Sequence, residues 1–385
     1  MYSGIWMYAW DLADESADRV MGWAADAGLQ ALQIAGSYHA GWFIHPHNPR
    51  HRAFMAPDGC VYFHPDITRY RQTVLKPRVA PVCQNIDWMR EAGKRLDKFG
   101  LKLVSWTVCT HNTRLGLLHP DCTVHNCFGD SYPHALCPAN NNVRRYISAL
   151  CADLAHNYPM HAIQLESPGF LGLQHGHHHE RDLTMLTSLE VALMDLCFCN
   201  SCMRFAEAKH IDAARVKAEV RELLNAGMAA APYRPASLPA TIAEAETKIN
   251  QLASYRAMRK EIEDSLIIEI RLAMNPSSAE LWLLGPYSKQ IENSIDVYCN
   301  GVYGLKASEV HTAVEAERRK TPSSRLLYTG VRLGLNSVRD EAELTDIVEN
   351  IAGAGGDGVM FYNYSESPMK TLEWIKPTLA HINRK

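Results

Sequence analysis

Short apolar runs alternate with amphipathic segments along most of the chain. Both alternating positions of each run are largely apolar, which is typical of a strand in a parallel sheet that is covered on both faces. We therefore predict an α/β protein with eight parallel strands. The runs lie at residues 4–10, 29–36, 101–109, 161–167, 280–286, 294–300, 325–333 and 356–364.

Segments with helical patterning separate these runs. Glycines at 28 and 100 predict two helix ends, and the asparagines at 140–142 can cap a third helix. Pro377 falls inside the last predicted helix, 371–382, where proline is unfavourable because it lacks a backbone N–H. Strands that are each followed by a helix predict a single (β/α)8 TIM barrel over residues 1–385. The interval 171–276, between strands 4 and 5, predicts a long helical insertion within that barrel.

Composition narrows the class of protein. The chain has 385 residues, of which 47% are apolar and 21% charged, and this is enough to build a large core. A net charge of -3 without a basic stripe argues against a nucleic-acid partner. No apolar stretch is long enough for a membrane span, and residues 1–16 do not resemble a signal peptide. We therefore expect a cytoplasmic protein with no membrane partner.

Polar and aromatic residues cluster where the predicted strands end, which is the face of a barrel that carries its active site. Aromatic faces stack on sugar rings, while amides and imidazoles hydrogen-bond hydroxyls. We therefore expect a small carbohydrate substrate, although aromatic rims also occur for purely structural reasons. The candidate substrate-binding residues are Trp10, His39, Trp42, Trp106, His111, Asn112, His175, His178, Tyr287, Tyr303, Arg332, Tyr362, Asn363 and Tyr364.

Glu166 ends the fourth apolar run, where burial without a role would be costly. An apolar environment would raise its pKa and suit it to act as a general acid, while an ion pair with Arg332 is the structural alternative. Glycoside hydrolysis needs a second carboxylate, which the sequence does not single out. We place Glu366 and Asp296 ahead of Asp11 and Glu180.

Three cysteines crowd into one short stretch, Cys197, Cys199 and Cys202. Because the chain has an odd total of 11 cysteines and no recognisable secretion signal, a metal site is more plausible than a disulfide framework. A structural zinc site needs four ligands, and the predicted fold brings Cys137 to the same end of the barrel. Cys122 and Cys127 are alternative fourth ligands. The histidine-rich stretch 173–182 is interpreted as substrate contact or packing in preference to a second metal site.

These motifs resemble the barrels of the glycoside hydrolase family 42 β-galactosidases and related putative glycosyl hydrolases. The resemblance is specific around residues 137–205 and 253–276. It implies that Glu166 is the strand-four acid/base and that Cys137 completes a zinc site with Cys197, Cys199 and Cys202. Leu165 stands where that family has asparagine before the acid, and strand seven, YTGVRLG, lacks the family's nucleophilic glutamate. The identity of the nucleophile and the stereochemical outcome therefore stay open.

We accordingly predict a glycoside hydrolase-like enzyme that acts on a small glycoside or oligosaccharide. One alternative is a metal-dependent sugar isomerase, epimerase or lyase that uses the histidines of 39–47 or 175–179. The other is a carbohydrate-binding barrel without catalysis. In each case the sequence is compatible with a homo-oligomer.

Overall fold

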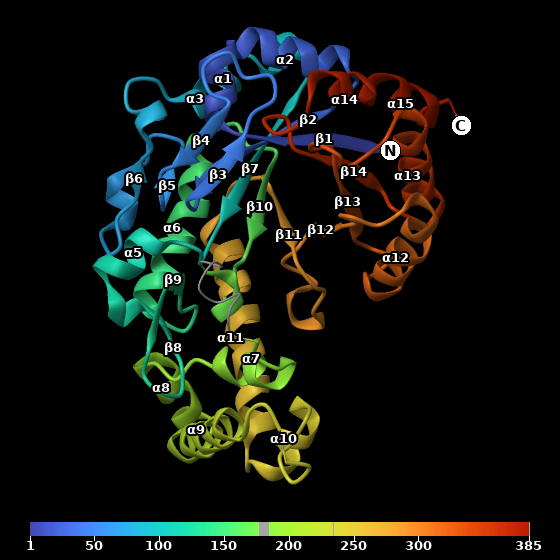
Figure 1. Cartoon of the computed structure of the whole chain (residues 1–385). Helices are drawn as coiled ribbons and strands as arrows, with labels where there is room; N and C mark the ends of the chain where they lie inside the picture. The colour runs from blue at the N-terminus through green and yellow to red at the C-terminus, as the bar shows by residue number, and fades with distance from the viewer. Residues whose placement is uncertain (177–184, 234, 385) are drawn as a thin grey trace.

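The computed structural model describes residues 1–176, 185–233 and 235–384. Eight parallel strands close into a barrel in the order in which they occur along the chain, with β1 paired to both β14 and β2 (Figure 1). This confirms the predicted (β/α)8 TIM barrel, with strand limits shifted by up to three residues. The barrel strands are β1 (Tyr2–Met7), β2 (Ala31–Tyr38), β7 (Lys102–Val108), β10 (Ala162–Glu166), β11 (Glu280–Leu284), β12 (Val297–Gly301), β13 (Leu326–Arg332) and β14 (Gly358–Tyr362).

Successive side chains along each barrel strand point alternately into the barrel and outward to the helices, so the core has an inner and an outer part. In β1, Ile5 and Met7 pack against the surrounding helices, while Trp6 joins the cluster that fills the barrel. Trp6 Nε1 donates a hydrogen bond of 2.7 Å to Gln164 Oε1 across the interior. Because β10 also alternates, Glu166 shares the inward face of Gln164 and lies at the carboxyl end of the strand.

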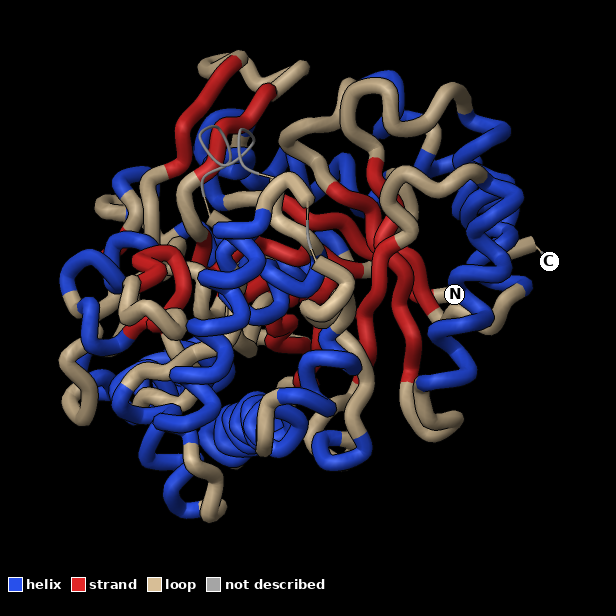
Figure 2. The backbone as a smooth tube through the Cα atoms, turned by 60° about the horizontal axis from the view of Figure 1, so that its bottom comes forward, coloured by secondary structure: helices blue, strands red, loops and turns tan. Residues whose placement is uncertain are grey.

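Helices surround the barrel strands, which gather near the centre of the molecule (Figure 2). The helices outside the long β10–β11 connection are α1 (Ala9–Glu15), α2 (Ala17–Asp26), α3 (Trp88–Gly93), α4 (Leu96–Phe99), α5 (Thr113–Leu118), α6 (Asn141–Asn157), α12 (Ala307–Lys320), α13 (Glu341–Gly353), α14 (Met369–Glu373) and α15 (Ile375–Ile382).

Two helix predictions need correction. The short connection between β11 and β12 holds only a 3-10 turn, Lys289–Ile291, so one strand is not followed by an α-helix. The last predicted helix is divided at Trp374 into α14 and α15. Pro377 therefore lies in the first turn of α15, where its missing N–H costs no helical hydrogen bond.

The connection from β2 to β7 builds an extra layer over one side of the barrel mouth. It contains the hairpin of β3 (Gly41–Ile44) and β4 (Ala53–Ala56), in which Phe43 pairs with Phe54. Strand β5 (Cys60–Val61) then adds antiparallel to β2, and β6 (Arg78–Val79) pairs with β5. A second hairpin, β8 (Thr123–His125) and β9 (Ser131–Leu136), follows α5.

The connection from β10 to β11 is helical and extends away from the barrel (Figure 1). Its buried side chains form a separate hydrophobic cluster that also takes in Val124 and Tyr132 of the β8–β9 hairpin. No helix in the described ranges is long and apolar enough to cross a membrane. The helices of this connection are α7 (Ser188–Met194), α8 (Asn200–Ala208), α9 (Ala213–Ala230), α10 (Ile242–Lys248) and α11 (Leu252–Ala273).

Candidate active site

A cavity of about 420 Å³, here called the central cavity, opens at the carboxyl ends of the barrel strands. Its size lies within the usual range for small-molecule sites. Aromatic rings, imidazoles, one carboxylate and one guanidinium converge on it. Its lining residues are Trp6, Tyr38, His39, Trp106, His111, Glu166, Gln174, His175, Leu284, Tyr303, Arg332 and Tyr362.

Glu166 is the carboxylate of the central cavity. Burial raises the pKa of Glu166, while a hydrogen bond donated by the Trp106 indole N–H to its carboxylate opposes that rise. Its partner among the described residues is thus Trp106 and not Arg332. The backbone that follows Glu166 is held by the Thr110 hydroxyl, which donates to Ser167 O at 2.7 Å and Gly169 O at 2.8 Å.

Glu366 lies in an adjoining cavity, here called the side cavity, which shares Arg332 and Tyr362 with the central one. Burial also raises the pKa of Glu366, although the Asn363 amide and the Arg332 charge oppose the rise. Asn363 Nδ2 donates to Glu366 Oε2 at 2.8 Å, and Glu366 N donates to Asn363 Oδ1 at 2.8 Å. Tyr362 lines both cavities, and burial raises its pKa, which the charges of Glu366 and Glu166 raise further.

Edge-to-face contacts between aromatic rings build the wall of the central cavity. Trp106 lies 5.0 Å from Tyr38 and 5.9 Å from Tyr362 between ring centroids, with interplanar angles of 71° and 80°. The Arg332 guanidinium lies 5.0 Å from the centre of the Tyr303 ring. Such surfaces suit the C–H faces of a sugar, with a cation at one edge.

A row of imidazoles continues the lining of the central cavity from Tyr38. His39 stacks on Tyr38 at 4.4 Å and on His111 at 4.1 Å, and His111 meets His175 edge-on at 4.7 Å. Burial lowers the pKa of His39, so this ring is neutral near pH 7. Neutral imidazoles both donate and accept hydrogen bonds, as recognition of hydroxyl groups requires.

Several residues predicted to bind substrate lie outside the central cavity. Asn363 lines the side cavity, and His178 falls outside the described residues. Asn112 caps α5 by accepting a hydrogen bond from Leu115 N at 2.9 Å, and Tyr287 donates to Glu292 at 3.0 Å. The central cavity is also not lined by three aromatic residues that were expected to stack on the sugar, Trp10, Trp42 and Tyr364.

The fold explains these three placements. Trp10 belongs to α1 and is buried on a different cavity. Tyr364 is buried, and its hydroxyl donates to Glu15 at 3.2 Å. Trp42 lies on the outer side of the β3–β4 hairpin, opposite the side that buries Phe43, and is 73% exposed.

The placement of Asp296 does not fit the role predicted for it. Asp296 precedes β12 at the amino-terminal end of the barrel, opposite the central cavity. It accepts a hydrogen bond from Leu281 N at 2.8 Å and pairs with Arg271 at 2.9 Å. Of the other carboxylates considered, Asp11 is buried in α1 against Ser365, and Glu180 lies outside the described residues.

Four lining residues were missed at the sequence level: Trp6, Tyr38, Gln174 and Leu284. Trp6 lies on the inward side of β1, but the neighbouring positions are equally apolar, so no alternation marks it. Tyr38 reaches the mouth because β2 extends past a register shift between Ala35 and Ser37. Gly36 lies at that irregularity, and a glycine inside a strand is a sequence signal for one.

A second cluster of functional groups lies beside the insertion. The sulfur atoms of Cys197, Cys199 and Cys202 lie 3.8, 3.5 and 3.6 Å from that of Cys137. Zinc–sulfur bonds of about 2.3 Å in a tetrahedron require sulfur separations of about 3.8 Å. The four thiols are buried, none is in a disulfide, and His125 N donates to Cys197 Sγ at 3.4 Å. The donor set therefore fits a tetrahedral metal ion.

Cys122 and Cys127, the alternative ligands, are not part of this group. Within the ranges that the structure describes, no other set of three or more His, Cys, Asp or Glu side chains converges closely enough to hold a metal. The histidines of 39–47 and His175 therefore form no such set with the described carboxylates.

Comparisons with known proteins identify the fold. No protein-family model and no curated protein matches the chain. Among solved structures, the chain is similar to a β-galactosidase from the psychrophilic Marinomonas ef1, with a TM-score of 0.60, 11% identity, and coverage of 100% of this chain and 60% of that one. An α-L-fucosidase isoenzyme 2 from Paenibacillus thiaminolyticus gives a TM-score of 0.58 and 11% identity, over 96% of this chain and 46% of that one.

The PgaB (BpsB) glycoside hydrolase domain from Bordetella bronchiseptica is similar over nearly its whole length. Its TM-score is 0.54 at 11% identity, with 99% of this chain and 97% of that one covered. The chain thus spans about half to three fifths of the first two proteins. The barrel is shared with glycoside hydrolases of several kinds, so the similarity supports a glycosidase-type fold and does not single out family 42.

Proposed function

We propose that this protein is a glycosidase acting on a small glycoside or oligosaccharide, with Glu166 as the general acid/base. One observation carries the proposal: two carboxyl groups with raised pKa, Glu166 and Glu366, lie on adjoining cavities that share Tyr362 and Arg332. Hydrolysis of a glycosidic bond generally uses two carboxyl groups that flank the bond, one as a protonated acid and the other as a carboxylate. The similarity to glycoside hydrolase barrels supports the same class of reaction.

The proposed roles follow from the environments of the two groups. Burial raises the pKa of Glu166, which extends to higher pH the range in which it is protonated and can donate a proton to the leaving oxygen. The Trp106 N–H then stabilises the carboxylate that remains. Glu366, which Asn363 and Arg332 favour in its charged form, is the proposed second carboxylate, acting as nucleophile or as base for a water molecule.

The test is turnover of a panel of aryl and natural glycosides by the wild type, Glu166→Gln and Glu366→Gln. Each substitution should lower kcat/KM by about 10²–10⁴-fold on the best substrate. Glu373→Gln, an exposed position at the end of α14, is the control and should leave turnover unchanged. The anomer released by the wild type, followed by NMR, distinguishes nucleophile from base for Glu366.

The rival functions make different predictions in the same assay. A metal-dependent isomerase or lyase would cleave no glycoside and would lose its activity with a chelator. A binding protein would bind sugars without turnover and retain its affinity in Glu166→Gln. No cleavage of any glycoside by the wild type would overturn the glycosidase proposal.

We further propose that Cys137, Cys197, Cys199 and Cys202 hold a structural zinc ion. The support is their burial and the match of their sulfur separations to a tetrahedral site. When bound, the ion would join the end of β9 to α8 and so connect the insertion to the barrel. All four coordination positions would be filled by protein, which leaves no place for substrate.

A further inference from the structure

A further cavity, here called the α11 groove, adjoins the central cavity and has a volume of about 450 Å³. Its walls come from three segments: the loop that follows β10, the end of β11 with the loop after it, and helix α11 of the insertion. Glu166 and Leu284 line both the α11 groove and the central cavity. The insertion therefore adds a space directly beside the proposed acid/base.

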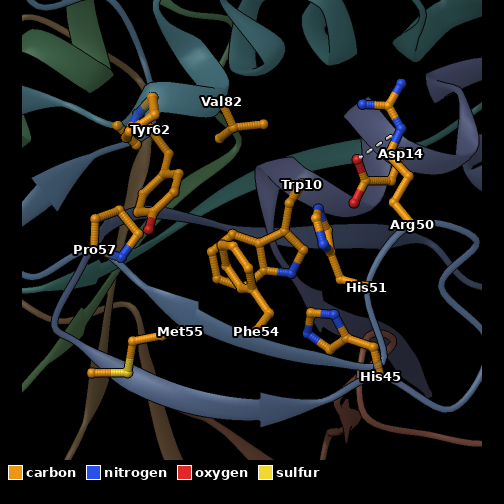
Figure 3. Close-up of a pocket in the computed structure, with 12 residues that line it drawn as sticks. Trp10, Asp14, His45, Arg50, His51, Phe54, Met55, Pro57, Tyr62 and Val82 are labelled. Carbon is orange, nitrogen blue, oxygen red and sulfur yellow. Dashed lines mark ion pairs between the residues drawn. The ribbon is translucent and has the colours of Figure 1, made fainter.

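The central cavity thus has two neighbours, at different strands of the barrel. The side cavity shares Arg332 and Tyr362 with it, which end β13 and β14, whereas the α11 groove shares Glu166 and Leu284, which end β10 and β11. Strand β12 lies between these two pairs of strands. The cavity under the β3–β4 hairpin, beside Trp10 (Figure 3), stands apart, because no described residue lines both it and any of these three.

The order of these cavities suggests what each one holds during glycoside cleavage. The acid must lie next to the leaving oxygen, and the second carboxylate must face the anomeric carbon or its attacking water. The sugar whose bond is cut therefore belongs in the central cavity, which adjoins Glu366 and is lined by Glu166. The leaving group lies on the far side of the acid, and the α11 groove is the second space that Glu166 lines.

The surface that the α11 groove offers to a ligand is largely apolar. Phe170 and Leu284 are partly exposed, and Pro286 is exposed. Behind them, the buried side chains of Ile267 and Leu283 join α11 to β11. Apolar surface that stays open to solvent beside a polar cavity favours a ligand that is apolar at that end.

The two charged side chains of the α11 groove already have partners within the protein. Lys260 Nζ lies 2.9 Å from Asp264 Oδ1, and Glu263 Oε1 accepts a hydrogen bond of 3.0 Å from Phe170 N. A second sugar unit would bury several hydroxyls against this surface, and each hydroxyl left without a partner costs free energy. An apolar group loses no hydrogen bond there.

We propose that the α11 groove binds the leaving group and that this group is apolar, so the substrate is an alkyl or aryl glycoside. This inference rests on the glycosidase function proposed above and names its substrate class. When the bond between the anomeric carbon and the leaving oxygen breaks, Glu166 gives its proton to that oxygen. The free alcohol then leaves through the α11 groove, and water supplies the hydroxyl of the released sugar.

The test is kcat/KM for the methyl, butyl and hexyl glycosides of the sugar and anomer that the glycoside panel identifies. Simple alkyl alcohols have similar basicity, so this series changes the buried apolar surface and not the chemistry of the leaving oxygen. From methyl to hexyl, kcat/KM should rise at least about tenfold, since one fully buried methylene contributes about fourfold. A disaccharide with the same sugar in the central cavity should be a poorer substrate than the hexyl glycoside.

Two matched glycine variants locate the alkyl chain. A Cβ at Gly285, in the α11 groove, would lie 3.7 Å from the Leu283 side chain, which is ordinary contact. Gly285→Leu should therefore fill the groove and bring the hexyl-to-methyl ratio of kcat/KM to within about twofold of one. Gly334→Leu is the control in the side cavity, where a Cβ would lie 3.7 Å from Ser337 Oγ. It should keep the wild-type ratio.

Each contrary result has a distinct meaning. Equal kcat/KM along the alkyl series of the wild type, or a hexyl preference that Gly285→Leu leaves intact, would overturn this inference and leave the glycosidase proposal standing. A disaccharide preferred over the hexyl glycoside would overturn the apolar leaving group. No turnover of any glycoside would overturn both proposals. The wild-type series needs no variant, and circular dichroism identifies a variant that has lost its fold.

Discussion

Burial of individual side chains sets the chemistry that the barrel mouth offers. Glu166 and Glu366 both have a raised pKa because protein replaces water around them, yet each is stabilised in its charged form by a different neighbour. For Glu166 that neighbour is the neutral Trp106 indole, whereas for Glu366 it is an amide together with a cation. Different neighbours for two carboxyl groups are how a site gives them separate roles.

The Trp106 hydrogen bond leads to a prediction about pH. A general acid works only while protonated, so kcat/KM should fall as pH rises through the pKa of Glu166. Because the Trp106 N–H favours the carboxylate, Trp106→Phe should raise that pKa further and move the alkaline limb to higher pH. The measurement is the pH profile of kcat/KM on the best glycoside.

Trp23→Phe is the control for that profile, since Trp23 lies outside the barrel near Tyr364. Its alkaline limb should coincide with that of the wild type. A limb that is unchanged or moves to lower pH in Trp106→Phe would contradict the role given to this hydrogen bond.

Contacts between elements depend on a few close approaches. Helix α5 packs against β9 at Gly116, where an added Cβ would lie 1.9 Å from the carbonyl oxygen of Pro133. In α2, a Cβ at Gly22 would meet only the Phe99 ring, at 3.5 Å. The same residue type is thus required at one helical position and dispensable at the other.

Alanine at these two glycines should have opposite effects. Gly116→Ala should lower the free energy of unfolding by about 1–3 kcal/mol or more, because the helix must move away from β9. Gly22→Ala should raise it by about 0.5–1 kcal/mol, the usual gain from replacing a helical glycine. Urea unfolding of both variants measures the difference, and equal effects would contradict the packing described.

The cysteine cluster makes a prediction about the connection between the hairpin β8–β9 and α8. Cys137→Ser should abolish stoichiometric zinc and make the insertion sensitive to proteases, because a structural metal stabilises only the folded state. Elemental analysis and limited proteolysis follow the two effects. Cys127→Ser, a buried cysteine outside the cluster, should retain both zinc and resistance. Zinc-free wild-type protein with full resistance would contradict the proposal.

At the scale of the whole molecule, closure of the barrel brings the two ends of the chain together. Strand β1 pairs with β14, and the helix after β1 contacts the loop after β14 through Asp11. The Ser365 hydroxyl donates to the Asp11 carboxylate at 2.6 and 2.7 Å. Burial nonetheless raises the pKa of Asp11 to about 7.

Asp11 should therefore make global stability depend on pH. Between pH about 4 and about 7 the folded state retains a proton that the unfolded state releases, so stability should fall as pH rises. The contribution is at most about 4 kcal/mol, because the pKa rises from 3.8 to about 7 on folding. Unfolding free energies across this range should decline more steeply for the wild type than for Asp11→Asn.

Asp26→Asn provides the comparison for Asp11, because Asp26 pairs with Lys376 on the exposed surface. Its curve should run parallel to that of the wild type, as surface ion pairs contribute little. Parallel curves for Asp11→Asn as well would show that Asp11 does not govern the pH dependence.

The sequence by itself determined the number and order of the barrel strands. A parallel strand that is buried on both faces needs an unbroken apolar run, and all eight runs can be recognised in the sequence. It also brought out the cysteine motif, since three thiols within six positions are close whatever the fold. Glu166 stood out for a similar reason, as a carboxylate at the end of an apolar strand.

Tertiary structure alone decided which side chains meet. In runs that are apolar on both faces, nothing in the pattern separates Trp6, inside the barrel, from Ile5, which faces the helices. Asp296 lies at the amino-terminal end of β12, away from the central cavity, because the strand begins only at Val297. Trp42 does not reach the cavity because the β3–β4 hairpin turns its side chain outward. The cavity that Trp10 lines is formed by segments distant in sequence, and only their packing brings Trp10, His45 and Tyr62 together.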